Sequence, residues 1–214
     1  MSRSAEADAA NEKPRVAVLA SGRGSNFEAL ARAFQAGEIP GKIVLLVVDK
    51  PEAGALKIAE RFGIPSLYLK FRRREREVFE ATLLEALRKH AIEYVFLAGF
   101  MRILGKPVID AYWGRILNIH PALLPSFPGL HAQAQALAAG VEESGCTVHF
   151  VDCGVDTGPI VLQRRVPVLP GDDEETLSAR ILEQEHLAYP EAARLVLTGR
   201  VRLEGDRVVR EESE

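Results

Sequence analysis

Short apolar runs alternate along the chain with longer segments whose apolar residues recur at helical spacing. The first, second and fourth of these runs are almost uninterrupted, which is typical of strands covered by helices on both faces of a sheet. The pattern predicts strands at residues 16–20, 43–48, 66–69, 94–98, 115–119, 147–151 and 160–168. It predicts helices at residues 27–35, 54–62, 73–90, 108–112, 133–139 and 174–198, with a small hairpin around 200–209.

Strands that alternate with helices predict an α/β fold, in which a doubly wound, mostly parallel twisted sheet has helices on both faces, as in Rossmann-like proteins. We expect one domain over residues 14–205, because no linker-like stretch divides the chain. The polar ends, residues 1–13 and 206–214, are expected to be flexible tails. Ligands of such sheets bind outside the carboxyl ends of the strands, so functional side chains are expected just after each strand.

The sequence SGRGSN at residues 21–26 directly follows the first strand. Ser25 and Glu28 match a capping box, which predicts that a helix starts here, and the free N–H groups of a helix start suit a phosphate. The loop lacks the third glycine of G-x-G-x-x-G, and the chain has no G-x-x-x-x-G-K-[ST] motif, so this is not one of the common nucleotide loops. A tight turn between strand and helix explains the same residues equally well.

The fifth strand carries Asn118 and His120 at its end. In a pleated strand these two side chains point to one side, whereas Leu117 and Ile119 point to the other. An amide donor beside an imidazole can stabilise an oxyanion and act in general acid–base catalysis, although a buried pair bonded to the backbone is the alternative. The long, proline-rich loop at 121–129 favours a functional interpretation, because rigid loops after strand ends often carry function.

Two carboxylates stand out further along the chain. Asp156 lies between Gly154 and Gly158, where it is either an Asx-turn residue or a carboxylate that orients and charges a histidine. Glu185 falls inside the apolar arc of the last helix, where a carboxylate needs either a ligand or an arginine as its partner. The arginine-rich stretch 72–77 is typical of a solvated helix start, with binding of a phosphate by one arginine as the alternative.

Composition narrows the possible functions. The 214 residues are 47% hydrophobic, as in ordinary globular proteins, and 27 basic and 30 acidic side chains leave a net charge of −3. This balance gives no general attraction to nucleic acid or to a membrane surface. Two cysteines argue against a disulfide framework, the histidines and cysteines show no zinc spacing, and no metal is expected. With neither a signal peptide nor an apolar run long enough for a bilayer, the protein is expected to be cytoplasmic.

Six stretches, spread over residues 16–203, together resemble the phosphoribosylglycinamide formyltransferases of the folate-dependent formyltransferase family. They are ASGRGSN at 20–26, LAGFMRIL at 97–104, LNIHPALLP at 117–125, TVHFV at 147–151, DTGPI at 156–160 and QEHLAYP at 184–190. The resemblance implies direct formyl transfer from the cosubstrate 10-formyltetrahydrofolate to the amine of N1-(5-phosphoribosyl)glycinamide. It further implies that the transfer passes through a tetrahedral intermediate, uses no metal and belongs to purine biosynthesis.

The same resemblance implies roles for individual residues. Asn118 and His120 are expected to stabilise the oxyanion, while Asp156 keeps His120 charged and relays protons. The expected ribonucleotide contacts are Gly24, Ser25 and Asn26 at the phosphate, together with Arg76 and Glu185. The expected folate site consists of Met101, Arg102, Ile103 and Leu104, with Asp152, Cys153, Gly154 and Val155 opposite them.

One departure and three alternatives accompany this interpretation. Gln133 stands where family members commonly carry a second histidine, so no role is assigned to it. A formyltetrahydrofolate hydrolase or a methionyl-tRNA formyltransferase is expected to need a further domain, and a non-catalytic Rossmann module would leave Asn118, His120 and Asp156 without a purpose. The expected partners are therefore small-molecule substrates, with no nucleic acid and no membrane, and the protein is expected to be a monomer or a homodimer.

Overall fold

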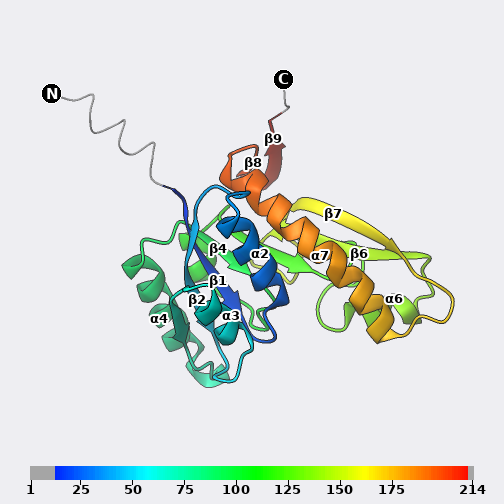
Figure 1. The fold of residues 1–214 in the computed structure, drawn as a ribbon, viewed down its shortest axis with the longest axis horizontal. Coiled ribbons are helices and arrows are strands. Elements are labelled where there is room, and N and C mark those ends of the chain that lie inside the picture. The colour runs from blue at the N-terminus through cyan, green and yellow to red at the C-terminus, as the bar shows by residue number, and fades with distance from the viewer. Residues whose placement is uncertain (1–12, 212–214) are drawn as a thin grey trace.

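The structure, a computed structural model, describes residues 13–211, and a seven-stranded sheet forms its centre (Figure 1). The strands are β1 (Arg15–Ala20), β2 (Lys42–Val48), β3 (Ser66–Tyr68), β4 (Tyr94–Leu97), β5 (Ile116–His120), β6 (Glu143–Phe150) and β7 (Ile160–Pro167). Their order in the sheet is β3-β2-β1-β4-β5-β6-β7, with β1 to β5 parallel and β6 and β7 antiparallel to their neighbours. The predicted mostly parallel, doubly wound sheet is confirmed.

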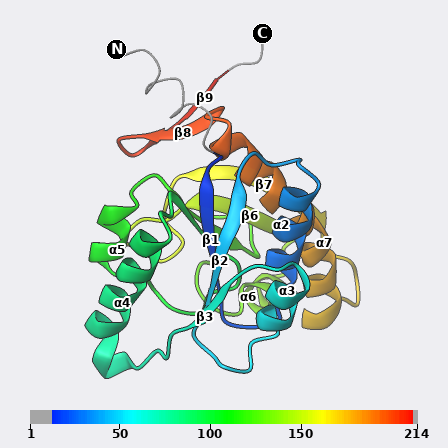
Figure 2. The same cartoon turned by 60° about the vertical axis from the view of Figure 1, so that its left-hand side comes forward.

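Helices cover both faces of the sheet (Figure 2). One face carries α2 (Ser25–Gln35), α3 (Ala55–Arg61) and α7 (Glu174–Leu197), and the other carries α4 (Arg76–Lys89) and α5 (Lys106–Ala111). The short helix α6 (Ala132–Ala138) contacts α7, and a 3₁₀ turn at Arg73–Glu75 precedes α4.

Strand β1 shows why the central strands are continuously apolar. Val16, Val18 and Ala20 belong to the core beneath α2, α3 and α7. Ala17 and Leu19, whose side chains point the opposite way, belong to the core beneath α4 and α5. Because successive side chains of a strand alternate between the two faces, a strand covered on both faces has no position left for a polar residue.

The order of the strands creates a crevice at one edge of the sheet. From β1 the chain moves outward to β2 and β3, and it then returns to β4 on the other side of β1. The segments after β1 and β4 meet there, since the Ser21 N–H donates to the Gly99 carbonyl at 3.1 Å. Such a reversal of strand order is where doubly wound sheets bind their ligands.

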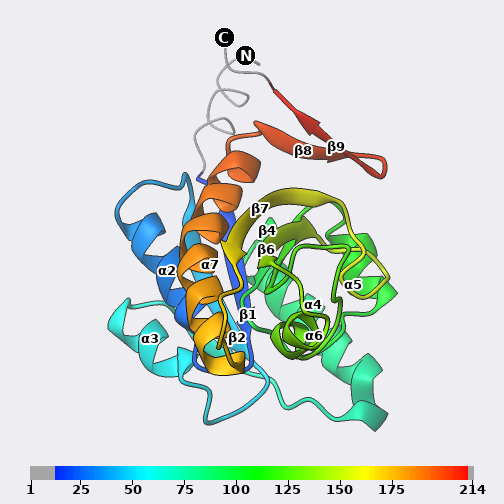
Figure 3. The same cartoon turned by 90° about the vertical axis from the view of Figure 1, so that its right-hand side faces the viewer.

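Every predicted strand and helix is present, most boundaries differ by only one or two residues, and two differences change the picture. Strand β6 begins at Glu143 rather than at residue 147. The prediction missed its first four residues because their sequence, ESGC, does not alternate between apolar and polar side chains. The predicted hairpin is formed by β8 (Val201–Glu204) and β9 (Arg207–Arg210), which project beyond the sheet (Figure 3). Regular structure thus continues past residue 205, where the domain was expected to end. The expected flexible tail at 206–214 was therefore wrong for the residues of β9, which pair with β8, and the parts of the two expected tails at 1–12 and 212–214 lie outside the described part of the chain.

Tyr189 provides a test of this packing. Its side chain is completely buried under the sheet, and its hydroxyl lies 3.0 Å from the Leu97 carbonyl of β4 and 3.1 Å from the Leu117 carbonyl of β5. We expect Tyr189→Phe to lower the free energy of unfolding by about 1–3 kcal/mol, because it removes a donor from buried acceptors. Urea denaturation measures this change. Tyr68→Phe, at a position that is 41% exposed, is the control and should differ little from the native protein.

Candidate active site

Four polar side chains from β5, from β6 and from the loop after β6 converge at one place. His120 Nδ1 lies 3.2 Å from Asp156 Oδ2, and Asn118 Nδ2 lies 3.4 Å from Asp156 Oδ1. His149 Nε2 lies 3.2 Å from Asn118 Nδ2 and 3.6 Å from Asp156 Oδ1. The Gly129 N–H also donates to Asp156 Oδ2 at 2.8 Å. The structure therefore brings together the three predicted residues Asn118, His120 and Asp156, and it adds His149.

Two glycines bring Asp156 to this position. A Cβ on Gly158 would lie 1.8 Å from the Phe150 carbonyl oxygen, so the loop after β6 can close this tightly only around a glycine. A Cβ on Gly154 would lie 1.9 Å from the Thr157 hydroxyl. Asp156 itself has a φ of 54°, a left-handed conformation that is uncommon outside glycine and more accessible to aspartate than to most residues.

The partners of Asp156 keep it ionised. Burial by itself would raise the pKa of this carboxyl group, but the hydrogen bonds from His149 and the Gly129 N–H, with the charges of the two histidines, hold the pKa below its ordinary value. His149 is itself held in place by the backbone. Its Nδ1 lies 2.8 Å from the Phe150 carbonyl, which can only accept, so Nδ1 carries a proton, and its Nε2 faces Asn118 Nδ2 and Asp156 Oδ1.

Burial and hydrogen bonding act in opposite directions on His120. Burial lowers the pKa of His120 more strongly than the Phe127 carbonyl and Asp156 raise it. Burial therefore opposes the expected charging of the ring by Asp156. Both ring nitrogens nevertheless face acceptors, Phe127 O at 2.8 Å from Nε2 and Asp156 Oδ2 at 3.2 Å from Nδ1. The ring is consequently placed to take up a proton.

The predicted phosphate loop begins α2 in a different way from the one expected. Helix α2 starts at Ser25 with Gly24 as its N-cap, and no side chain caps it. Glu28 instead binds Arg32 and Arg61, so the predicted capping box was wrong. Gly24 has a φ of 84°, and a Cβ there would lie 2.8 Å from Ala55, which restricts this position to glycine. The N–H groups at the helix start are consequently left available for an anion.

Glu185 reaches the same loop from α7. Its side chain is buried, at 6% exposure, and its Oε2 accepts a hydrogen bond from Asn26 Nδ2 at 2.7 Å. Its partner is thus the Asn26 amide of the segment 21–26, called here the glycine loop, rather than the arginine that was the alternative. Burial raises the pKa of Glu185 from 4.5 to about 6, against the opposing effect of the Asn26 hydrogen bond. The Asn26 Oδ1 atom is buried without a hydrogen-bond partner, so it can accept from a ligand.

Two cavities meet at this edge of the sheet. The histidine cavity, of about 540 Å³, is lined by Asn118, His120, His149 and Asp156. The glycine-loop cavity, of about 900 Å³, is lined by Gly24, Ser25, Asn26 and Glu185. The residues that line both are Gly99, Met101, Ile119, Pro121, Gln133 and Glu174. The cavities therefore form one continuous cleft, and Gln133 lies at their junction.

Most of the other predicted residues lie in the cleft as well. The histidine cavity is also lined by Met101, Arg102, Ile103, Leu104, Asp152, Gly154 and Val155. Cys153 is exposed and is not among the described residues that line it. The structure does not bring Arg76 to the glycine loop: its guanidinium is bound by Glu80 Oε1 at 2.7 Å and by the Ile103 carbonyl at 3.1 Å.

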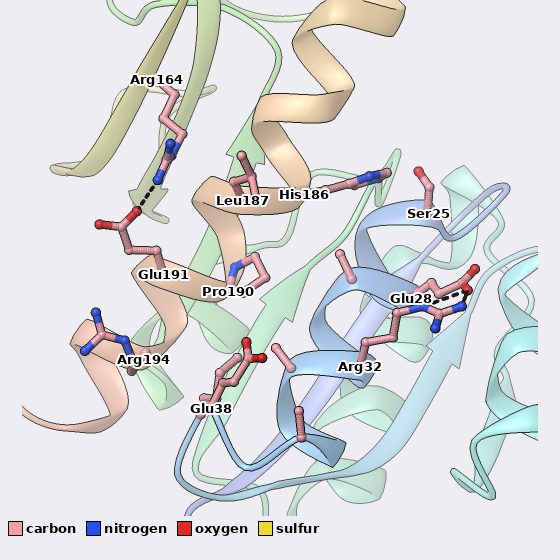
Figure 4. Close-up of a pocket in the computed structure, with 14 residues that line it drawn as sticks. Ser25, Glu28, Arg32, Glu38, Arg164, His186, Leu187, Pro190, Glu191 and Arg194 are labelled. Carbon is pink, nitrogen blue, oxygen red and sulfur yellow. Dashed lines mark hydrogen bonds and ion pairs between the residues drawn. The ribbon is translucent and has the colours of Figure 1, made fainter.

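A third hollow, of about 740 Å³, lies between α2 and α7 on the outer side of the glycine loop (Figure 4). Four of its charged side chains are paired, since Arg164 binds Glu191 at 2.6 Å and Arg32 binds Glu28. Ser25 lines both this hollow and the glycine-loop cavity, whereas none of the four converging residues lines it. The hollow therefore adjoins the glycine-loop cavity but does not reach the cluster around Asp156.

Within residues 13–211, no group of three or more histidine, cysteine, aspartate or glutamate side chains is arranged to hold a metal ion. None of the helices in this part of the chain is both long enough and apolar enough to span a membrane.

Glu185 makes the stability of the protein depend on pH. Because its pKa is raised from 4.5 to about 6 on folding, its favourable contribution is complete below pH 4.5 and is lost as the pH rises through 6. The change corresponds to roughly 2 kcal/mol. We expect the native protein to lose about that much more unfolding free energy than Glu185→Gln between about pH 4.5 and pH 7.5. Urea denaturation at both pH values measures this, and equal losses would contradict the assignment.

Comparison with known proteins places this geometry in a family. The pattern of the formyl transferase family matches residues 14–193. Phosphoribosylglycinamide formyltransferase of Bacillus subtilis (strain 168) is 44% identical over 184 residues, which are 86% of this chain and 94% of that protein. The crystal structure of glycinamide ribonucleotide transformylase 1 from Symbiobacterium toebii has a TM-score of 0.89 and 46% identity, covering 93% of this chain and 94% of that one.

Larger proteins contain the same unit. The trifunctional purine biosynthetic protein adenosine-3 of Drosophila pseudoobscura pseudoobscura is 50% identical over 193 residues, which are 89% of this chain. The match spans only 14% of the length of that relative. The family match, the relatives and the fold agree with the arrangement of the cleft. The chain belongs to the formyl transferase family, and among its members it is similar to the phosphoribosylglycinamide formyltransferases.

Proposed function

We propose that the protein transfers a formyl group from 10-formyltetrahydrofolate to the amine of N1-(5-phosphoribosyl)glycinamide. The observation that carries this proposal is the continuous cleft, which joins a helix start suited to a phosphate to the cluster of Asn118, His120 and Asp156. The names of the similar proteins support phosphoribosylglycinamide as the acceptor of the formyl group. Each half of the cleft therefore takes one substrate, and the reacting atoms meet beside the cluster.

The glycine-loop cavity suits the ribonucleotide. The uncapped N–H groups at Gly24, Ser25 and Asn26 lie at the positive end of α2 and would bind the phosphate. Glu185 and the unpartnered Asn26 Oδ1 lie next to them and would accept hydrogen bonds from the rest of the substrate. Arg76 is not retained in this site, because its guanidinium binds Glu80 and the Ile103 carbonyl instead.

The histidine cavity suits the flat, partly apolar pteridine of a folate. Met101 and Ile103 are 56% and 59% exposed, and Val155 is exposed as well, so three large apolar side chains face solvent around this cavity. Exposed apolar side chains gathered at a cavity are typical of ligand-binding surfaces. Asp152, Gly154 and Val155 would form the side opposite Met101 and Ile103.

The proposed reaction is a direct transfer. The amine nitrogen forms a bond to the formyl carbon, the bond from that carbon to N10 of the folate breaks, and one proton passes from the amine to N10. The Asn118 amide donates to the oxyanion of the tetrahedral intermediate. His120 takes up the proton that the amine loses, because Asp156 and the Phe127 carbonyl then accept from both of its N–H groups.

The alternative function is hydrolysis of the formyl group, in which water replaces the amine. An ultraviolet assay of folate deformylation, run with and without the ribonucleotide, separates the two. We expect deformylation only in the presence of the ribonucleotide, together with formation of the N-formyl product. Equal rates in its absence would show that the protein is a hydrolase.

Asp156→Asn tests the proposed chemistry. This change keeps the shape of the side chain but removes its charge, and we expect kcat to fall by about 100-fold or more while both substrates still bind. Because Asp156 raises the pKa of His120, the pKa of that ring in the variant should be lower still, as measured by NMR. Asp110→Asn, which alters an exposed ion pair with Lys106, is the control. Normal turnover with an unchanged His120 titration would return Asp156 to a purely structural role.

Ser25→Asp tests the phosphate site. A carboxylate at the helix start would repel the phosphate, so we expect the KM for the ribonucleotide to rise by about tenfold or more. The KM for the folate should change less than about twofold, because the folate binds in the other half of the cleft. Ser66→Asp, at an exposed position of the edge strand β3, adds the same charge away from the cleft. An equal effect of both substitutions would mean that only the overall charge matters.

A further inference from the structure

The segment Gly99–Gly105, called here the wall loop, connects β4 to α5 along the histidine cavity. It forms neither a helix nor a strand, so side chains from other segments must fix its conformation. Met101 and Ile103 project from it into the open part of the cleft, whereas Phe100 and Leu104 are buried beneath it. The shape of this wall therefore depends on what holds the loop from below.

Glu80 of α4 holds the far end of the wall loop. Its side chain is only 8% exposed, and its Oε1 accepts hydrogen bonds from the Gly105 N–H at 2.8 Å and from Arg76 Nε at 2.7 Å. Arg76 Nη2 in turn donates to the Ile103 carbonyl at 3.1 Å. One buried carboxylate and its arginine thus bind two backbone groups of the wall loop.

Glu80 packs closely against the backbone of the loop at Gly105. A Cβ on Gly105 would lie 2.4 Å from Glu80 Oε2 and 2.6 Å from Oε1, so a larger residue here would have to displace the carboxylate. The φ of Gly105 is −86°, which any residue can adopt, so the constraint at this position comes from the contact with Glu80. The carboxylate and the loop backbone are therefore packed against one another as one unit.

Three further contacts hold the near end of the loop. Ser21 Oγ accepts a hydrogen bond from the Met101 N–H at 2.9 Å. The Asp49 side chain, which is fully buried after β2, accepts from Arg102 Nε at 2.6 Å, and the Arg102 guanidinium lies 4.6 Å from the centre of the Phe71 ring. The near end is thus fixed independently of Glu80, so a change at Glu80 would loosen chiefly residues 103–105.

A simple helix-stabilising role does not account for Glu80. A glutamate–arginine pair spaced by four residues on an exposed helix surface contributes only about 0.3–0.5 kcal/mol, and burying a carboxylate costs more than this. Glu80 is buried, and it receives a second donor from outside its helix, the Gly105 N–H. The burial of the Glu80 carboxylate is therefore explained by its binding of the wall loop through the Gly105 N–H and Arg76.

We propose that Glu80 is a positioning residue, which sets the affinity for the formyl donor by fixing the backbone at Ile103 and Gly105. It touches no substrate and acts through Arg76 and the Gly105 N–H. The inference rests on the proposed function, because it takes the histidine cavity as the folate site. It also gives Arg76 a role on the folate side of the cleft, in place of the expected contact with the ribonucleotide.

The test compares Glu80→Ala with Glu80→Gln and with Glu77→Ala. For Glu80→Ala we expect the KM for 10-formyltetrahydrofolate to rise by about tenfold and the KM for the ribonucleotide to change less than about twofold, since only one wall of the cleft is loosened. Glu80→Gln should recover most of the affinity, because its amide oxygen still accepts from the Gly105 N–H. Glu77→Ala, an exposed position on the same helix, should resemble the native protein.

Amide hydrogen exchange gives a second readout that needs no activity. The Gly105 N–H should exchange faster in Glu80→Ala than in the native protein, whereas the Met101 N–H, held by Ser21, should not. If Glu80→Ala does not fold, Arg76→Gln replaces it, because the Arg76 side chain is 42% exposed and its loss leaves the core intact. That variant should weaken folate binding in the same selective way.

The outcomes separate the inference from the function on which it rests. A native protein that transfers no formyl group would overturn the proposed function and the claim about folate affinity with it. An active protein in which the two KM values rise together, or in which neither rises, would overturn the positioning role alone. Unchanged exchange at Gly105 in Glu80→Ala would do the same.

Discussion

A single carboxylate, that of Asp156, organises the candidate active site. It takes hydrogen bonds or close contacts from Asn118 and His120 on β5, from His149 on β6 and from the Gly129 N–H in the loop after β5. A largely desolvated carboxylate is tolerated only where donors surround it, and here they come from separate segments of the chain. The position of each segment is thereby tied to the charge of one side chain.

The fold supplies these donors through the direction of its strands. The parallel strands β1, β4 and β5 end at the same edge, which places the glycine loop, the wall loop and the Asn118–His120 pair around one cleft. Strand β6 runs the opposite way and pairs Asn118 with His149 across the sheet. This antiparallel pair lets an amide on one strand be oriented by a ring on the next, while the chain after β6 returns with Asp156.

The sequence predicted those parts of the fold and site that depend on local pattern. Apolar runs and helical spacing located the strands and helices, and the strand period placed Asn118 and His120 on one side. Local patterns could not predict contacts between distant segments. The contact of His149 with Asn118 depends on the register between β5 and β6, and the contact of Arg76 with the wall loop depends on how α4 packs on the sheet. The burial of His120, which lowers the pKa of its ring against the effect of Asp156, also depends on such packing and has no signal in the sequence. The capping box failed because Gly24, pressed against Ala55, takes the N-cap position.

The central claim is that two substrates meet in one cleft beside the carboxylate cluster. A crystal structure of the protein with N1-(5-phosphoribosyl)glycinamide and a folate that cannot donate a formyl group tests it most directly. We expect the phosphate on the N–H groups of residues 24–26 and the pteridine against residues 101–104. The amine should lie within about 3–3.5 Å of the position of the formyl carbon, beside Asn118 and His120. A phosphate bound in the hollow between α2 and α7, or an amine far from these two side chains, would contradict it.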